Sequence, residues 1–330
     1  MSEQVVLAPQ DWIRRSATHL GRVDALLGPY LRARAAGRPH PVIDFLFTYY
    51  SLKPGQLRRW HPGFGVVLAA PAPDYSKSSG YRTSAVGVTV DPALLTRRRQ
   101  TIEYVHRLLS ATAARTPLLA CFGLHEWAMT YRAEEVRHGS VPLRLGRAGT
   151  DAVVEALPLR CTHFDAYRFF TEPARPRNEA TLTRQTQLAT EQPGCLHATM
   201  DLYKFTYKLL PLVDSELLMD ALELAHAARE LDMRASPYDL RSYGYEPVAI
   251  ETPAGRAEYT RAQAELSARA VDVRAALLGR CRDLLEVGDA RAVAPDAGDR
   301  ELLAQGAGTI RGELEAAAAP NSGIAAPAQV

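Results

Sequence analysis

Two short segments pair a histidine with an aspartate closely enough for acid–base chemistry. In CTHFDAYRFF, His163 lies two residues before Asp165, and in CLHATMDLYK, His197 lies four residues before Asp201. A helix that begins near residue 196 would place His197 and Asp201 on one face. A carboxylate fixes the tautomer of a neighbouring imidazole, and such a pair can act as a general base or as metal ligands. We expect the catalytic residues among these four side chains; helix caps and paired core residues are the alternative.

Two further pairs of ionisable residues are secondary candidates. His40 and Asp44 in HPVIDFLF are four residues apart, and His125 and Glu126 are adjacent in GLHEWAM, within an apolar segment. An unpaired charge in such a segment would be costly. A buried salt bridge is therefore the alternative interpretation of His125 and Glu126.

A third pattern is typical of iron sites. Glu103 and His106, like Glu223 and His226, form a Glu-x-x-His pair on a segment with helical periodicity. Di-iron carboxylate bundles use two such pairs and one carboxylate from each of two other helices. The second pair lies on the same face of its predicted helix as further glutamates, which indicates a solvated face and not a metal site.

The elements that must position these residues are mostly helices. Apolar residues recur at helical spacing over most of the chain, and strand candidates are few. We expect a mainly α, multi-helix globular domain with a small β element. The predicted helices are 11–36, 92–114, 117–136, 196–210, 214–232 and 254–287, with a shorter one after Pro41, and the predicted strands are 65–69, 85–90 and 152–157.

Composition is that of a globular protein with a sizeable core. Of the 330 residues 47% are hydrophobic and 23% are charged. No apolar run approaches the roughly 18 residues of a membrane span, and the first residues lack the pattern of a secretory signal. The four cysteines are scattered, as in a reducing compartment. We expect a cytoplasmic protein without a membrane partner.

Charge divides the chain into two parts. Residues 1–150 carry 20 Lys and Arg against 10 Asp and Glu, and residues 151–330 carry 19 against 27. We predict a basic, mostly helical part at 1–150 and an acidic helical part at 151–315 that carries the His/Asp cluster, packed together as one unit. A tail at 316–330, rich in Ala, Pro and Gly, is predicted to be disordered. The basic part suggests a polyanionic partner, although attraction between the two parts explains the asymmetry equally well.

The segment WHPGFG at 60–65 resembles the hairpin of helix-hairpin-helix DNA glycosylases, which holds a DNA phosphate. The helix that should follow is interrupted by Pro71 and Pro73. The next aspartate beyond the loop, Asp91, precedes Pro92 at a helix start, where it would act as an N-cap. We therefore expect a glycine-rich turn that leads from a short helix into a strand.

Basic and aromatic residues near this turn are the candidates for contact with nucleic acid. Arginine pairs with phosphate through two hydrogen bonds, and an enzyme that extrudes a base stacks it on aromatic groups. The segments FLFTYY and FDAYRFF supply such groups, although aromatic stripes also form ordinary cores. The predicted DNA-binding residues are Arg58, Arg59, Trp60, His61, Arg97, Arg98 and Arg99.

Several longer segments resemble one protein family. HPVIDFLFTYYSLKPGQLRRWHPG, GLHEWAM, CTHFDAYRFF, EQPGCLHATMDLYK and DMRASPYDL are similar to a family from high-GC bacteria commonly labelled 3-methyladenine DNA glycosylase. The resemblance extends over about residues 10–290. It implies hydrolysis of the N-glycosidic bond of an alkylated purine in double-stranded DNA, without a cofactor.

The leading hypothesis combines this resemblance with the His/Asp cluster. Asp165 is the first candidate for the carboxylate that activates water and stabilises the positive charge on the sugar, with His163 orienting it. Asp201 is the second candidate. One alternative is a metal-dependent oxidoreductase, holding non-haem iron or manganese through His163, Asp165, His197 and Asp201. Another is a non-catalytic binding protein.

Overall fold

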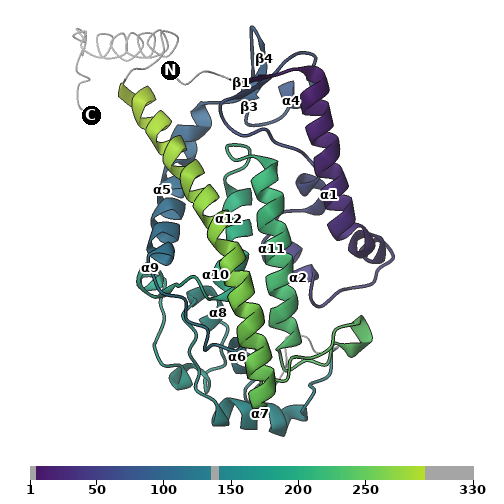
Figure 1. Ribbon diagram of the computed structural model, residues 1–330, viewed down its shortest axis with the longest axis vertical. Coiled ribbons are helices and arrows are strands. Elements are labelled where there is room, and N and C mark those ends of the chain that lie inside the picture. The colour runs from purple at the N-terminus through teal and green to yellow at the C-terminus, as the bar shows by residue number, and fades with distance from the viewer. Residues whose placement is uncertain (1–4, 135–140, 294–330) are drawn as a thin grey trace, which may run out of the picture. The chain divides into compact units, whose positions relative to one another are not determined.

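The computed structural model describes residues 5–134 and 141–293 (Figure 1). It divides after Leu285, within the last helix, into two units, and every residue of the site described below belongs to the first unit. The predicted tail at 316–330 and residues 294–315 of the predicted acidic part lie outside the described residues.

Over the described ranges the protein is mainly α-helical with a small sheet, as the sequence predicts. The long helices are α1 (Pro9–Ala35), α5 (Ala93–Ala113), α10 (Leu196–Lys208), α11 (Ser215–Arg234) and α12 (Pro253–Val293). The shorter elements are α2 (Asp44–Thr48), α3 (Pro54–Leu57), α4 (Pro73–Ser76), α6 (Leu124–Ala128), α7 (Gly146–Ala156), α8 (Phe164–Tyr167), α9 (Gln187–Thr190) and the 3₁₀ turns η1 (Arg175–Arg177) and η2 (Arg241–Tyr243).

Helices α10 and α11 form the centre of the core. They lie side by side (Figure 1), and α11 also packs against α1. The start of α11 is fixed by Asp214, whose carboxylate accepts a hydrogen bond from the Leu217 backbone N–H at 2.9 Å. Helix α12 holds the chain just before α10, because Gln263 donates a hydrogen bond to the Gly194 carbonyl at 2.7 Å. Both central helices bury most of their surface, so the polar residues that they carry lie inside the protein.

The sheet has four strands in the order β1-β2-β4-β3. Strand β1 (Val5–Leu7) runs parallel to β2 (Val66–Leu68), and β4 (Gly87–Val90) runs antiparallel to both β2 and β3 (Tyr81–Ser84). The predicted strands at 65–69 and 85–90 are therefore confirmed. The sheet contributes Leu68 and Val88 to a buried hydrophobic cluster with Trp60 and Tyr75.

The segment WHPGFG is a turn, as predicted, and the next element is a strand and not a helix. Gly63 and Gly65 both have φ of +86°, which favours glycine, and the chain then enters β2. Asp91 also has the predicted structural role, since its carboxylate accepts a hydrogen bond from the Ala93 backbone N–H at 3.0 Å, at the start of α5.

Two predicted elements are wrong. Residues 152–157, predicted as a strand, belong mostly to α7, where Thr150, Val153 and Val154 are buried at the three- and four-residue spacing of a helix face. The predicted helix at 117–136 is reduced to α6 within its described part, because Gly123 adopts a left-handed conformation with φ of +70° just before it.

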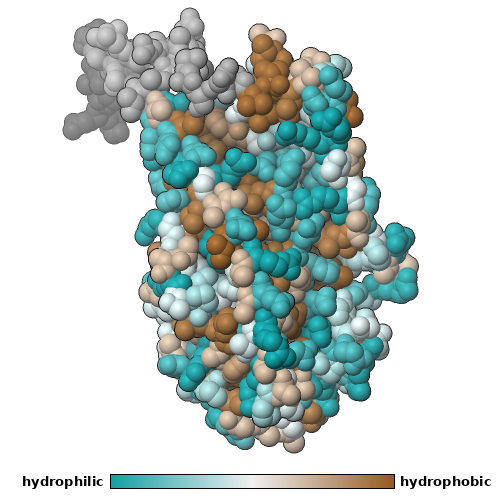
Figure 2. All heavy atoms as spheres, viewed as in Figure 1, coloured by the Kyte–Doolittle hydropathy of each residue, from teal (hydrophilic) through white to brown (hydrophobic). Residues whose placement is uncertain are grey.

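The surface bears no sign of a membrane span in the ranges described. None of their helices is both long and apolar enough to cross a bilayer. On the face drawn in Figure 2, hydrophobic residues gather over the small sheet, where Val5, Val6 and Val86 are exposed.

Candidate functional site

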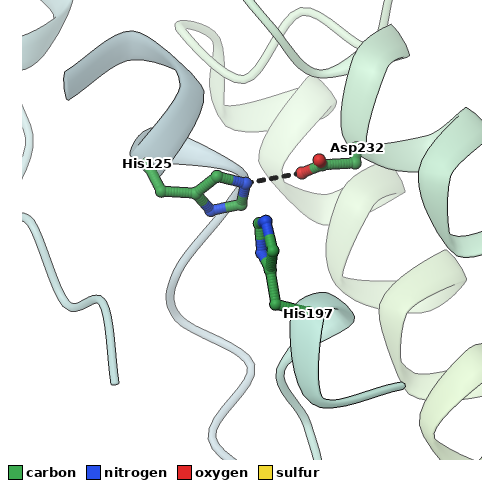
Figure 3. Close-up of side chains that lie close together, drawn as sticks. All are labelled: His125, His197 and Asp232. Atoms are coloured by element: carbon green, nitrogen blue, oxygen red, sulfur yellow. Dashed lines mark hydrogen bonds and ion pairs between the residues drawn. The ribbon is translucent and has the colours of Figure 1, made fainter. Parts of the chain in front are cut away.

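Three helices bring His125, His197 and Asp232 together in the interior (Figure 3). His125 lies in α6, His197 in the first turn of α10 and Asp232 near the end of α11. Their relative exposures are 3%, 6% and 0%. His125 Nε2 lies 2.7 Å from Asp232 Oδ1, and one potential ligand atom from each residue lies within 4.8 Å of the others. The three side chains therefore form one buried polar cluster.

His197 lies between two other imidazoles. Its ring meets His125 edge-on, with 4.5 Å between ring centroids, and stacks on His163 at 5.3 Å. Burial lowers the pKa of His197 well below its usual value, and the neighbouring His125 lowers it further. Its Nδ1 is buried without a hydrogen-bond partner. His197 is therefore a neutral imidazole, one of whose nitrogens makes no hydrogen bond inside the protein.

His163 faces two carboxylates. Its Nε2 lies 3.3 Å from Asp201 Oδ2 and 3.5 Å from Glu191 Oε2. Asp201 also accepts a hydrogen bond from the Tyr50 hydroxyl at 3.0 Å and pairs with Lys204. Burial alone would raise the pKa of Asp201, but Lys204 and His163 outweigh it and hold that pKa below its usual range. Asp201 therefore remains ionised inside the protein.

The predicted contact between His163 and Asp165 is not formed. His163 directly precedes α8 and Asp165 is the second residue of that helix, and residues two apart at a helix start do not face each other. Asp165 instead pairs through Oδ1 with Arg184 at 2.8 Å and lies 3.5 Å from Lys204 through Oδ2. His163 therefore positions Asp201 rather than Asp165.

A cavity of about 400 Å³ opens beside this cluster. His197 and Asp165 line it, whereas His163, Asp201 and His125 are not among its lining residues. The lining also includes the secondary candidates Asp44 and Glu126. Four aromatic rings complete the wall, namely Phe45, Tyr49, Phe169 and Tyr243.

A buried arginine ties the cavity wall to the cluster. Arg229, 2% exposed, donates through Nη1 to Glu126 Oε1 at 2.7 Å and to Asp232 Oδ2 at 2.8 Å. Its guanidinium also lies over the Phe45 ring, 4.2 Å from the centroid. The buried salt-bridge interpretation of His125 and Glu126 is therefore confirmed, although each residue pairs with α11 and not with the other, because adjacent residues on a helix point in different directions.

The other secondary pair is also joined differently from the prediction. Asp44 Oδ2 accepts a hydrogen bond from the backbone N–H of His40 at 2.8 Å, not from its imidazole. Asp44 Oδ1 accepts from the Tyr30 hydroxyl at 2.7 Å and pairs with Arg34. The carboxylate therefore closes the turn before α2 and does not prepare His40 for proton transfer.

Sequence reasoning missed four charged residues of the site: Glu191, Lys204, Arg229 and Asp232. The signal for two of them was present in the sequence. Arg229 and Asp232 are three residues apart on α11, where Ala225, Ala228 and Leu231 are buried, and charges on a buried helix face require partners. Glu191 carries no comparable local signal, because its partner His163 is supplied by a distant segment.

A second hollow, a groove of about 940 Å³, collects part of the predicted DNA-binding set. It is lined by Arg59 and His61 from one predicted segment, by Arg98 from the other, and by Lys208. No aspartate or glutamate is among its lining residues in the part of the chain described. The groove therefore presents positive charge without a local counter-charge.

The rest of the predicted DNA-binding set lies elsewhere. Trp60 is 1% exposed and donates its indole N–H to Glu216 at 3.1 Å, so it is a core residue that cannot stack on a base. Arg58 pairs with Asp24. Arg97 and Arg99 pair with Asp91 and Glu103 at 3.2 and 2.8 Å.

The glutamates of the two Glu-x-x-His pairs form salt bridges at the surface. Glu103 pairs with Arg99, and Glu223 pairs with Arg22 at 2.8 Å. Their side chains are 43% and 41% exposed. These carboxylates are solvated, which does not favour a buried di-iron centre.

Comparisons with protein-family models, curated proteins and solved structures gave no match. The chemistry of the site therefore follows from its geometry. A neutral imidazole, three carboxyl side chains and aromatic rings line one cavity, and a basic groove lies close to it in the chain: Tyr49 lines the cavity and Ser51 lines the groove.

We predict that Arg229→Leu lowers the free energy of unfolding by about 3–5 kcal/mol, because Glu126 and Asp232 would be left buried without their counter-charge. Adding Glu126→Leu should recover part of this loss. Arg22→Leu, which removes an exposed pair, should cost less than about 1 kcal/mol. Urea unfolding measures all three, and equal costs for Arg229→Leu and Arg22→Leu would contradict the account.

We predict that His61 makes the protein less stable as the pH falls. Burial, with Arg59 and His19 nearby, lowers the pKa of His61 from 6.5 to about 3. Below pH 6.5 the unfolded chain takes up a proton that the folded protein does not, so stability falls towards pH 3 by up to about 1.4 kcal/mol per pH unit.

The matched variant is His61→Asn, which can keep the hydrogen bond that links His61 Nδ1 to the Tyr81 hydroxyl at 2.7 Å. It should show a shallower loss between pH 6.5 and 4 in urea unfolding. Parallel pH profiles for the two proteins would refute the role of His61.

Proposed function

We propose that the protein is a DNA glycosylase that hydrolyses the N-glycosidic bond of alkylated purines. The observation that carries the proposal is the cavity, in which four aromatic rings share the wall with Asp44, Glu126 and Asp165. A purine alkylated on a ring nitrogen within a nucleotide is flat and positively charged. Aromatic faces attract such a cation. Glu126 is already paired with Arg229, which also lines the cavity, so the rings carry the preference for a cation.

The two candidate carboxylates differ in their access to the cavity. Asp165 lines it, while Asp201 is 1% exposed and is bound by Tyr50, His163 and Lys204. Asp165 therefore remains the first candidate for the group that stabilises positive charge at the sugar. In this scheme the bond from the purine nitrogen to C1′ breaks and its electron pair leaves with the base.

His197 is the candidate for the general base. A water molecule that bonds to C1′ must lose a proton, and the neutral imidazole of His197, which lines the cavity, can accept it. These roles differ from the hypothesis drawn from the sequence, because His197 and Asp165 now act at the cavity. His163 stacks on His197 and is itself held by Asp201.

The groove supplies a surface for the DNA backbone. Arg59, Arg98 and Lys208 line it, and an extruded nucleotide leaves its two flanking phosphates outside the cavity. Only Tyr50 separates Tyr49 of the cavity from Ser51 of the groove along the chain. A backbone bound in the groove would therefore lie near the cavity that receives the base.

We predict that the purified protein releases methylated purines from alkylated duplex DNA and that Asp165→Asn slows release at least about 100-fold, since a charged group at the reacting centre is lost. Chromatography of the released bases under single-turnover conditions measures the rate. Asp11→Asn, which alters a carboxylate in an exposed ion pair, is the control and should leave the rate unchanged. Absence of release by the native protein would refute the proposal.

We predict that Arg98→Ala weakens binding to duplex DNA and reduces the salt dependence by about one ion, because one phosphate contact is lost. Fluorescence anisotropy at several salt concentrations gives the slope. Arg14→Ala, at an exposed position of α1, should keep the native slope. If both variants have the native slope, the DNA backbone does not use the groove.

A further inference from the structure

The cluster of His125, His197 and Asp232 has the composition of a metal site. The potential ligand atoms of the two imidazoles and the carboxylate lie within 4.8 Å of one another, and all three side chains are more than nine-tenths buried. Figure 3 shows the His197 ring pointing towards the His125–Asp232 pair. Three side chains from three helices thus converge on one point.

His197 provides an independent observation. Its Nδ1 is buried without a hydrogen-bond partner, although a buried imidazole nitrogen normally has one. Contacts with His125 and His163 hold the ring in place, so the free nitrogen is not the result of a loose side chain. A metal ion would satisfy the valence that the protein leaves open.

The groups behind the cluster match those that support metal ligands. Arg229 binds Asp232 Oδ2 at 2.8 Å, and Oδ1 lies 2.7 Å from His125 Nε2, so a metal ion would replace the contact between these two atoms. Cys121 Sγ lies 3.5 Å from His125 Nδ1, which leaves Nε2 directed at the cluster. Such outer contacts orient metal ligands and tune their basicity.

The cluster also has an open side. His197 lines the cavity of about 400 Å³, whereas His125 and Asp232 are not among its lining residues. A three-ligand site beside a cavity leaves at least one coordination position for water or for a bound molecule. This is the arrangement of a reactive rather than a closed structural site.

We propose that His125, His197 and Asp232 bind one divalent transition-metal ion. Two imidazoles and a carboxylate suit Zn²⁺ and Fe²⁺ better than Mg²⁺ or Ca²⁺, which prefer oxygen ligands. This set replaces the ligands predicted from the sequence, of which only His197 remains. The metal site goes beyond base excision, whose scheme needs no metal; because an ion bound to His197 would compete with its role as general base, base release is measured on the metal-free protein.

The test is metal binding by the full-length protein. The protein, stripped with a chelator and kept anaerobic, is titrated with Co²⁺ as a spectroscopic probe, and Zn²⁺, Fe²⁺ and Mn²⁺ are then compared by competition. We expect one equivalent of Co²⁺ to bind and Zn²⁺ or Fe²⁺ to displace it more readily than Mn²⁺. His197→Asn should weaken Co²⁺ binding at least 100-fold.

His197→Asn is the informative variant because His197 Nδ1 makes no hydrogen bond that folding would lose. Asp232→Asn should weaken binding similarly, with circular dichroism as a check on folding. His226→Asn, on the same helix as Asp232, is the control and should bind Co²⁺ as the native protein does. Because Cys121 is near, Cys121→Ser should also retain binding.

Two results would overturn the proposal. One is native protein that binds Co²⁺ no more tightly than His197→Asn does. The other is a thiolate-to-cobalt charge-transfer band that disappears in Cys121→Ser, which would assign the metal to cysteine. Both results concern metal binding alone, and base release is measured on the metal-free protein, so the metal site and the glycosylase activity are judged by separate measurements.

Discussion

The buried guanidinium of Arg229 is the interaction on which the site depends. One nitrogen of this side chain serves Glu126 on α6 and Asp232 on α11, both inside the protein. The pairing fixes the position of α6 against α11. Asp232 in turn holds His125, whose ring packs edge-on against His197. The position of His197 in the cavity wall therefore depends, through these contacts, on the buried charge of Arg229.

A second set of charges lies on the other side of His197. His163, Asp201 and Lys204 neutralise one another there, and Glu191 lies within 3.5 Å of His163. Such networks rarely stabilise a protein more than apolar side chains of the same volume would. Their gathering around one neutral imidazole, in the wall of a cavity, is instead typical of a functional site.

The sequence predicted the long helices and two strands because their patterns are local. Apolar periodicity defines α1, α5, α10 and α11, and the glycines of WHPGFG mark its turn. It failed at 152–157, where two adjacent valines suggested a strand although Thr150 completes a helical face. The register of the small sheet and the short α6 depend on contacts that no local pattern contains.

The sequence also predicted only part of the site, because its patterns are local. His163, Asp165, His197 and Asp201 do surround one region, and Asp44 and Glu126 reach the same cavity. Their partners could not be assigned, because the packing of α8 against α10 decides whether Asp165 or Asp201 lies beside His163. Trp60 was predicted to face DNA, but its place beneath the sheet follows from tertiary packing alone.

The central claim is that the cavity accepts a flat, positively charged purine. The direct measurement is the affinity of the protein for 7-methylguanosine, which is cationic, compared with guanosine, which is neutral and nearly the same shape. The account predicts at least about tenfold tighter binding of the methylated nucleoside, equivalent to about 1.4 kcal/mol, and loss of this preference in Tyr49→Leu. Equal affinity for the two nucleosides, or a preference that survives in Tyr49→Leu, would contradict it.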